Sequence, residues 1–380
     1  MRAAQYSGPR TGVAKPMKIY RAENVGSLQR PAYLVEAQRN LRSGKLPVAD
    51  YKRIEDRAVT EAIRLQEAVG LDVLTDGEQR RFHFRDWLVR AVDGLSPIKA
   101  PPVLLHGMSG HADVERSDPL TVTGKLRLKE SVATEEFVYA RAMTGKPIKV
   151  TLPHPFMYLL MYGPESRQIY PRSMDLFSDA ALLVRQQCVE LAALGCEYIQ
   201  IDAPVLTLPL DPKGRESLQR LDLTPEQFLD EGVRIMDVIA DVPGLQFAAH
   251  YCRGNSPTHY FSKGGYDQAA KVLFQGSRRI QTYLLEYDDW RAGSFEALKF
   301  VPRDKVIVLG LVSSMKHPAL EEIDDLAGRV DEAAAYFPKE QLALSAQCGF
   351  CSMVGVEGFD ASVQRAKLER IVAAARRIWN

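Results

Sequence analysis

The sequence predicts an α/β protein, a single (β/α)8 TIM barrel with a β-hairpin inserted near the mouth of the barrel. Two observations favour this class. Eight short apolar segments of the kind that form buried parallel strands recur along the chain, and stretches of helical periodicity separate most of them. The 380 residues, 46% of them hydrophobic, supply a large core, and barrels with insertions reach this length as one domain. A doubly wound open sheet is the alternative, because one or two short strands are easily miscounted.

The predicted strands are short and apolar, and most of them end at polar or small residues. The first of them ends near residues 25–27. The others cover 72–78, 148–153, 198–204, 246–252, 282–286, 306–311 and 342–348. The clearest helical patterns cover 50–69, 177–194, 224–240, 318–335 and 360–378. The third of these helices has the best defined start, with Thr224 as a cap, Pro225 in the first turn and an acidic residue after it.

Three segments fall outside this alternation. Residues 1–16 are basic and rich in Gly, Pro and Ala, and we expect a flexible N-terminal tail before a single zinc-binding catalytic domain over 17–380. Residues 95–125 are turn-rich and β-like, which predicts a hairpin over the barrel mouth. Residues 253–279 hold a glycine-rich loop before a short helix at 266–274.

The charge balance and the cysteine count limit the classes of partner. The chain has 49 basic and 48 acidic residues, so it has no excess positive field for nucleic acid or an anionic membrane. Five cysteines give no even disulfide framework, which favours a reducing, cytoplasmic location. We expect no secretion signal and no membrane span, because the start lacks an apolar core and no run of 18 apolar residues occurs.

Four potential metal ligands follow predicted strands in the last third of the chain. His250 and Cys252 are two residues apart, so on a strand they point to the same face, while Glu286 and Cys348 end later strands. In a parallel barrel these strand ends meet on one face, and imidazole, thiolate and carboxylate are the donors that Zn2+ prefers. The sequence therefore predicts a Zn2+ site. The alternative is that these are buried core residues, which is the commoner role of any single Cys or His.

Several motifs, in their order and separation, resemble those of one family. They are residues 76–81, 199–204, 250–252 and 347–350. From about residue 25 to its end, the chain resembles the C-terminal catalytic barrel of the cobalamin-independent methionine synthases, a family related to the epoxyalkane:coenzyme M transferases.

The resemblance implies roles for the matching residues. It implies that His250, Cys252, Glu286 and Cys348 hold zinc, with Asp288 as an alternative to the glutamate.

For the substrate homocysteine, the resemblance implies that Glu78 and Asp202 bind the amino group and that the turn of Val25, Gly26 and Ser27 binds the carboxylate. The alternatives are an ion pair between Glu78 and a neighbouring arginine, and a turn role for Asp202.

The chain departs from the family pattern in three respects. It has one barrel where the classical enzymes have two homologous halves. The Trp that follows the 148–153 strand in the family is absent here, where the chain has Phe156, Met157, Tyr158 and Leu159. The family's proton-donating His corresponds to Ser313, and His317 is a second weak candidate for that role. These departures leave the methyl donor open between methyl-folate and another carrier.

We therefore expect a zinc-dependent methyl or alkyl transfer to a thiol, with homocysteine as the first candidate. A coenzyme M-type transferase is the alternative, but its sulfonate substrate has no amine for Glu78 and Asp202. A non-catalytic zinc- or thiol-binding protein is the alternative of another class. A homo-oligomer is compatible with the sequence. A redox role for Cys348 and Cys351 is less favoured, because the C-x-x-C does not begin a helix of thioredoxin type.

Overall fold

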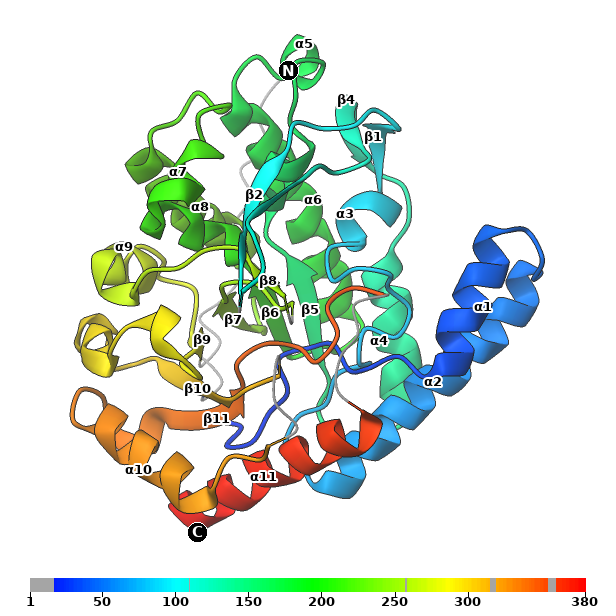
Figure 1. The fold of residues 1–380 in the computed structure, drawn as a ribbon. Helices are drawn as coiled ribbons and strands as arrows, with labels where there is room; N and C mark the ends of the chain where they lie inside the picture. Colours follow the sequence, from blue (N-terminus) through cyan, green and yellow to red (C-terminus); the bar gives the residue numbers. More distant parts are fainter. Residues whose placement is uncertain (1–16, 109, 257, 315–318, 355–359) are drawn as a thin grey trace, which may run out of the picture.

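The computed structural model describes residues 17–108, 110–256, 258–314, 319–354 and 360–380 (Figure 1). The predicted tail at 1–16 and the catalytic candidate His317 lie outside the described residues.

Six parallel strands form the central sheet, in the order β11–β10–β9–β7–β6–β5. Nearly every residue in them is buried, as expected for parallel strands that are covered on both faces. The strands are β5 (Lys149–Pro153), β6 (Tyr198–Asp202), β7 (Gln246–Tyr251), β9 (Thr282–Glu286), β10 (Val306–Val312) and β11 (Leu342–Ala346).

Single parallel bridges connect the two edges of this sheet. Ala22 pairs with Leu344 of β11, the next residue pairs with Val73, and Leu74 pairs with Ile148 beside β5. Eight parallel segments thus follow one another in a ring, in agreement with the predicted (β/α)8 class. The first two predicted strands are reduced to bridges, because the chain leaves the ring at once for the polar loops around residues 24–27 and 75–78.

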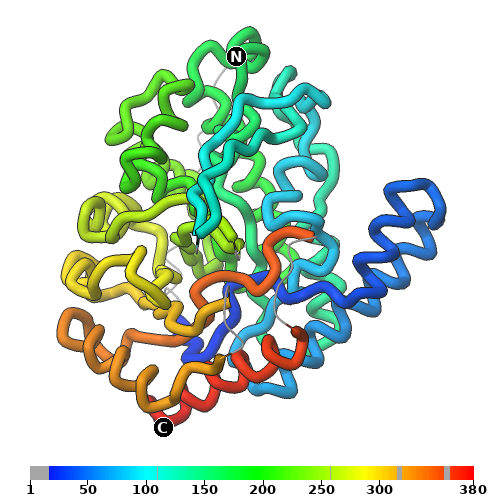
Figure 2. The backbone as a smooth tube through the Cα atoms, viewed as in Figure 1, coloured from blue at the N-terminus to red at the C-terminus, as the bar shows by residue number. Residues whose placement is uncertain are grey.

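The helices surround the sheet, and the α1–α2 pair extends away from it (Figures 1 and 2). The longer helices are α1 (Ala32–Arg42), α2 (Val48–Val69), α4 (Val132–Ala142), α6 (Ser173–Ala193), α8 (Pro225–Ile239), α10 (Ile323–Ala334) and α11 (Ala361–Trp379). Five of them match the predicted helices to within a few residues, and α1 and α4 were not predicted. The predicted cap of α8 is a complete capping box, in which Thr224 and Gln227 exchange hydrogen bonds of 2.9 and 3.2 Å.

The short helices complete the connections between these elements. They are α3 (Trp87–Arg90), α5 (Ser166–Ile169), α7 (Pro212–Glu216) and α9 (Ala270–Gln275), with 3-10 turns η1 (Pro155–Met161), η2 (Pro204–Leu210), η3 (Tyr266–Gln268), η4 (Trp290–Ala292), η5 (Phe295–Phe300) and η6 (Lys339–Gln341). The helix predicted at 266–274 is thus divided between η3 and α9.

The two predicted insertions pair with each other. In the first, β1 (Val92–Ser96) lies antiparallel to β4 (Thr121–Leu128), and β2 (Val103–Gly107) pairs with β3 (Val114–Arg116). The second contributes β8 (His259–Tyr260), which adds to the other edge of β2. The predicted hairpin is therefore present, and a segment about 150 residues further along the chain extends it into a three-stranded sheet. Among the described helices, none combines the length and the apolar character needed to cross a bilayer.

Candidate metal centre and substrate cavity

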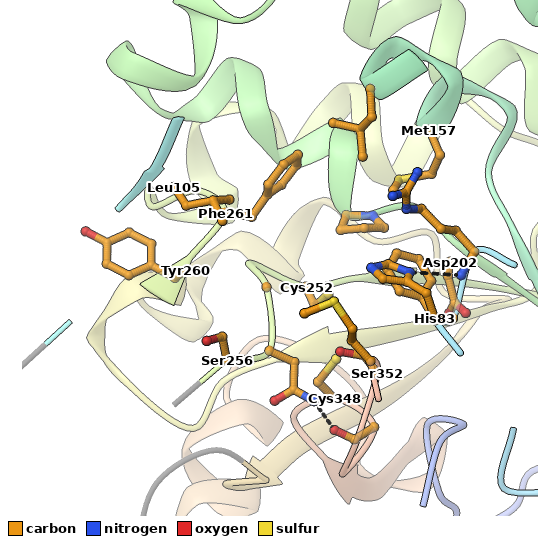
Figure 3. A pocket seen from close by; sticks show the side chains of 18 of the residues that line it. His83, Leu105, Met157, Asp202, Cys252, Ser256, Tyr260, Phe261, Cys348 and Ser352 are labelled. Carbon is orange, nitrogen blue, oxygen red and sulfur yellow. Dashed lines mark hydrogen bonds between the residues drawn. The ribbon is translucent and has the colours of Figure 1, made fainter. Parts of the chain in front are cut away.

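A cavity of about 240 Å³ opens where the loops that follow the parallel strands meet the inserted sheet. Residues from the ends of β6, β7 and β11 line its floor, and β2 and β8 line its outer wall. Figure 3 shows Cys252 and Cys348 close together, with His83 and Asp202 on one side and Leu105, Tyr260 and Phe261 on the other. The floor of the cavity is therefore rich in sulfur, and the insertions add the side chains of Leu105, Tyr260 and Phe261.

His250, Cys252 and Cys348 come together at this floor. One potential ligand atom from each lies within 4.8 Å of the others, and all three residues are buried. His250 is in β7 and Cys252 directly follows it, so the two-residue period of a strand gives them a common face. Cys348 arrives from the loop after β11, which lies three strands away in the sheet.

The hydrogen bonds of His250 leave one ring nitrogen available. Its Nδ1 lies 3.2 Å from the carbonyl oxygen of Leu284, which can only accept, so Nδ1 carries the proton. Its Nε2 is buried and has no hydrogen-bond partner. A backbone carbonyl that fixes the tautomer in this way is the usual companion of a metal-bound imidazole.

The two sulfurs share a hydrogen bond, which raises the pKa of Cys348 well above its ordinary value. The hydrogen bond from the Cys348 thiol lowers the pKa of Cys252 well below its ordinary value, so the pair holds a thiolate readily. An imidazole lone pair and two sulfurs, of which one ionises readily, are the donor set that Zn2+ takes in proteins. The residues present fit this ion.

Glu286, the predicted fourth ligand, lies in a different set of contacts. Its Oε2 accepts the backbone N–H of Arg253 at 2.9 Å, and its Oε1 lies 2.8 Å from the Arg291 guanidinium. It groups closely with Asp288 and Asp289 rather than with the His–Cys–Cys trio. Burial raises the pKa of Glu286 to about 8. The role of Glu286 as a zinc ligand stays a prediction.

Glu78 lines the cavity in an unusual backbone conformation. Its φ of 53° is in the left-handed region, which costs a non-glycine residue about 1 kcal/mol. Its Oε1 accepts a hydrogen bond from Thr151 at 2.8 Å, while Oε2 is buried without a partner. The predicted alternative of an ion pair is present only at 3.5 Å, to Arg81, which is bound more closely by Glu136.

Asp202 and the turn at residues 25–27 approach the same space. Asp202 lines the cavity at the end of β6, where burial raises its pKa to about 7 and Gln200 donates to it at 2.7 Å. Val25 and Ser27 line the cavity as well, and Gly26 between them packs against Glu78 and Thr151. A Cβ at Gly26 would lie 2.8 Å from Glu78 Oε1, so the glycine permits this approach.

The position predicted to replace the family's catalytic histidine lies elsewhere. Ser313 donates its backbone N–H to Glu321 at 2.9 Å and is not among the residues that line the cavity. Its neighbour Ser314 contacts the loop that carries Cys348, where its Oγ donates to the Gly349 carbonyl at 2.9 Å. The side-chain amide of Asn255 donates to the same carbonyl. Asn255 therefore joins the loop after Cys252 to the loop that carries Cys348, and Ser314 joins the latter loop to the end of β10.

Several residues that line the cavity were not singled out from the sequence, among them His83, Arg85 and Arg116. The first two follow the 76–81 motif within four residues, and this proximity was the available signal. Arg116 belongs to the inserted sheet, so only its tertiary position links it to the cavity.

Comparison with known proteins identifies the family of the chain. The family model described as the catalytic domain of cobalamin-independent synthase matches residues 21–377. The uncharacterized protein YxjH of Bacillus subtilis (strain 168) is 33% identical over 365 residues, which are 95% of each chain. The 5-methyltetrahydropteroyltriglutamate–homocysteine methyltransferase of Streptomyces griseus is 26% identical over 379 residues, which are 99% of this chain and 44% of that enzyme.

Two solved structures are similar to this one over nearly the whole chain. The putative vitamin-B12 independent methionine synthase from Listeria monocytogenes has a TM-score of 0.71 and 25% identity, and the match covers 97% of this chain and 100% of that one. A B12-independent methionine synthase from Shewanella sp. W3-18-1, in complex with selenomethionine, has a TM-score of 0.73 at 20% identity, covering 95% and 98%; this is a likeness of fold. The match of the family model over nearly the whole chain, together with the 33% identity to YxjH, shows that the protein belongs to the cobalamin-independent methionine synthase family.

Proposed function

We propose that this protein transfers a methyl group to the sulfur of homocysteine in a zinc-dependent reaction. The observation that carries the proposal is the convergence, in one cavity, of a buried His–Cys–Cys trio with two buried carboxylates. Membership of the family supports methyl transfer to a thiol. The identity of the thiol and the need for zinc rest on the residues of this cavity.

His250, Cys252 and Cys348 would hold the metal, with Glu286 as the further ligand that the family resemblance implies. When bound, a zinc ion with an exchangeable position supplies a lowered pKa for an incoming thiol and so favours its nucleophilic thiolate form. The protein contributes a dry, fixed environment, since each of the three side chains is at most 7% exposed.

The two carboxylates would orient the amino acid. Glu78 has one carboxylate oxygen with no partner, and the high pKa of Asp202 shows the cost of burying its charge. A substrate ammonium between them would relieve this cost, because an opposite charge nearby lowers a carboxyl pKa again. Ser27, on the same wall, would meet the substrate carboxylate.

The two alternatives differ in what they require of the cavity. A sulfonate thiol such as coenzyme M brings no ammonium, so it would leave Glu78 and Asp202 buried and uncompensated. A protein that only binds zinc or a thiol has no need of the apolar space beyond the trio, which side chains such as Leu105, Met157 and Phe261 line. That space gives a second substrate access to the sulfur, so the methyltransferase is favoured over both.

Metal analysis and calorimetry on the full chain test the proposal. We expect about one zinc per chain, lost in Cys252→Ser and Cys348→Ser but retained in Cys188→Ala, a buried cysteine of α6 outside the cavity. Homocysteine should bind the zinc-loaded protein, and Glu78→Gln should weaken it about tenfold or more.

The final readout is methionine formed from homocysteine and a panel of methyl donors. Binding of coenzyme M without binding of homocysteine would replace the proposal by its first alternative. Zinc and homocysteine binding without methionine from any donor would favour the non-catalytic alternative.

A further inference from the structure

Three buried carboxylates lie around one buried arginine, and one of the three lines the substrate cavity. The arginine is Arg81, which is 2% exposed, and the carboxylates are Asp76, Glu78 and Glu136, each at most 7% exposed. Burial by itself lowers the pKa of Arg81, but Glu136, Glu78 and Asp76 raise it by more, so that it lies well above its ordinary value. The guanidinium is therefore charged, and all three acids act on it.

The guanidinium of Arg81 is divided unequally between two of these acids. Its Nε lies 3.2 Å from both carboxylate oxygens of Glu136, and its Nη2 donates to one of them at 2.7 Å. Its Nη1 approaches Glu78 Oε1 only to 3.5 Å and donates to the Thr151 hydroxyl at 2.9 Å. Its Nη2 also donates to the backbone carbonyl of Thr151 at 2.9 Å. Arg81 is thus bound mainly to Glu136 and Thr151.

This arrangement orients one oxygen of Glu78 and leaves the other available. The Thr151 hydroxyl accepts a hydrogen bond from Arg81 and donates one to Glu78 Oε1 at 2.8 Å, so it links the two charged groups. Glu78 Oε2 is buried and has no hydrogen-bond partner among the described residues. The carboxylate that lines the cavity therefore keeps one uncompensated oxygen.

Other nearby arginines are bound elsewhere. Arg80 pairs with two acids of α2, at 2.7 and 2.5 Å. Arg30 donates to three backbone carbonyls in the described part of the chain and not to a carboxylate. Among the described residues, Arg81 is therefore the cation within ion-pair distance of the Glu78 carboxylate.

The strongest partner of Arg81 comes from outside the cavity. Glu136 lies on the buried side of α4, next to Phe137, and it is not one of the residues that line the cavity. Across the described residues, its side chain accepts hydrogen bonds from Arg81 alone. Its neighbour Glu135 is exposed and pairs with Lys52. An effect of Glu136 on a ligand in the cavity would therefore pass through Arg81.

Accepting the proposed function, we infer that Glu136 is a positioning residue for the amino-acid site: by holding Arg81, it keeps the second carboxylate oxygen of Glu78 available to the substrate ammonium. Charge-assisted hydrogen bonds between such groups measure about 2.7–2.9 Å, so a shift of about 0.6–0.8 Å from the present 3.5 Å would close an ion pair between Arg81 and Glu78. A guanidinium paired with Glu78 would repel the ammonium and compete with it. Glu136 opposes this shift because it is the closer partner.

Two thiols of the same length test the inference on the full, zinc-loaded chain. Homocysteine and 4-mercaptobutyrate share the thiol, the carbon chain and the carboxylate, and the second lacks the amino group. Calorimetry on the unsubstituted chain should give tighter binding of homocysteine by about tenfold or more, because only homocysteine offers an ammonium to the buried carboxylates. In Glu136→Gln this preference should fall about fivefold or more, while the affinity for 4-mercaptobutyrate stays unchanged.

Two further variants accompany this measurement. Glu135→Gln is the matched control, since it makes the same change one residue away on the exposed side of α4, and its preference should equal that of the unsubstituted chain. Thr151→Val nearly keeps the shape of the side chain and removes the hydroxyl that links Arg81 to Glu78. It should also lower the preference about fivefold or more, and it decides the question if Glu136→Gln does not fold.

A double variant shows whether Arg81 carries the effect. Adding Arg81→Gln to Glu136→Gln removes the competing guanidinium and should restore much of the preference for homocysteine. A preference that stays low in the double variant would mean that Glu136 acts without Arg81, which overturns the inference.

The unsubstituted chain separates the proposed function from the role of Glu136. If it binds the two thiols equally, no ammonium is recognised, and the assignment of Glu78 and Asp202 in the proposed function fails together with the inference. If it prefers homocysteine and Glu136→Gln does so equally, the inference alone fails. Equal weakening of both thiols in Glu136→Gln would identify a merely structural role for this residue and would also overturn the inference.

Discussion

Substitution of Gly349 by alanine tests whether two loops of the candidate site are held in contact. Gly349 follows the predicted ligand Cys348 and packs on Ser27. Phe350 donates its backbone N–H to the Ser27 carbonyl at 2.8 Å, and Cys351 donates to the Ser27 hydroxyl at 3.3 Å. The loop that carries Cys348 therefore packs directly on the turn at residues 25–27, which is predicted to bind the substrate carboxylate.

The geometry sets the size of the effect. A Cβ on Gly349 would lie 2.1 Å from Ser27 Oγ and 3.0 Å from the Ser27 backbone nitrogen. Rotation of the hydroxyl relieves the first contact, but the second requires the loops to separate. Overpacking of this kind costs about 1–3 kcal/mol of unfolding free energy. With an unfolding entropy of about 2.1 cal/mol/K per residue over this chain, the expected fall in Tm is about 1–4 °C.

Differential scanning calorimetry and competition with a chelator measure the two consequences. We expect Gly349→Ala to lower Tm and to weaken both zinc and homocysteine binding, because the displaced loop carries Cys348. Gly328→Ala is the matched control, since this exposed glycine of α10 has nothing within 4 Å of the added Cβ. There the change should stabilise the helix by about 0.5–1 kcal/mol. A Gly349→Ala protein with unchanged Tm and metal affinity would refute the packing argument.

Three other predictions concern different parts of the molecule. Asn255→Ala removes a hydrogen bond to the Gly349 carbonyl and should weaken zinc binding about 10-fold or more in chelator competition. An unchanged zinc affinity would exclude a role for Asn255 in holding the loop that carries Cys348. Lys149→Met leaves Glu23 buried without its 2.5 Å partner and should lower the free energy of unfolding in urea by about 3–5 kcal/mol. Adding Glu23→Gln should restore much of that stability, and an equal loss in the single and double variants would contradict the prediction. Burial raises the pKa of Asp76 to about 6 from 3.8, so ionisation of the native carboxyl destabilises the fold as pH rises through this interval. Asp76→Asn should therefore gain about 1–3 kcal/mol on the unsubstituted chain between pH 4 and 7, whereas a pH-independent difference would refute this.

The sequence was sufficient where short-range geometry decides the structure. The period of a strand places His250 and Cys252 on one face whatever surrounds them, and the cap at Thr224 begins α8 as predicted. The apolar strand segments and the intervening helices also fixed the fold class, since buried parallel strands need continuous apolar runs.

The sequence was insufficient where a partner comes from far along the chain. The hydrogen bond from Asn255 to the Gly349 carbonyl joins loops that are 94 residues apart. The strand β8 pairs with β2 only because two distant insertions meet over the barrel. The helices α1 and α4, each of 11 residues, were missed.

The distribution of charge within the cavity is the clearest property that the sequence does not contain. A net charge of +1 gives no sign that Glu78, Arg85, Arg116 and Asp202 line the same cavity. The sequence by itself determined the donor set and the class of fold, because both follow from residue type and local periodicity. Only the tertiary structure decided which charges face each other, because that depends on the packing of loops separated by tens to hundreds of residues.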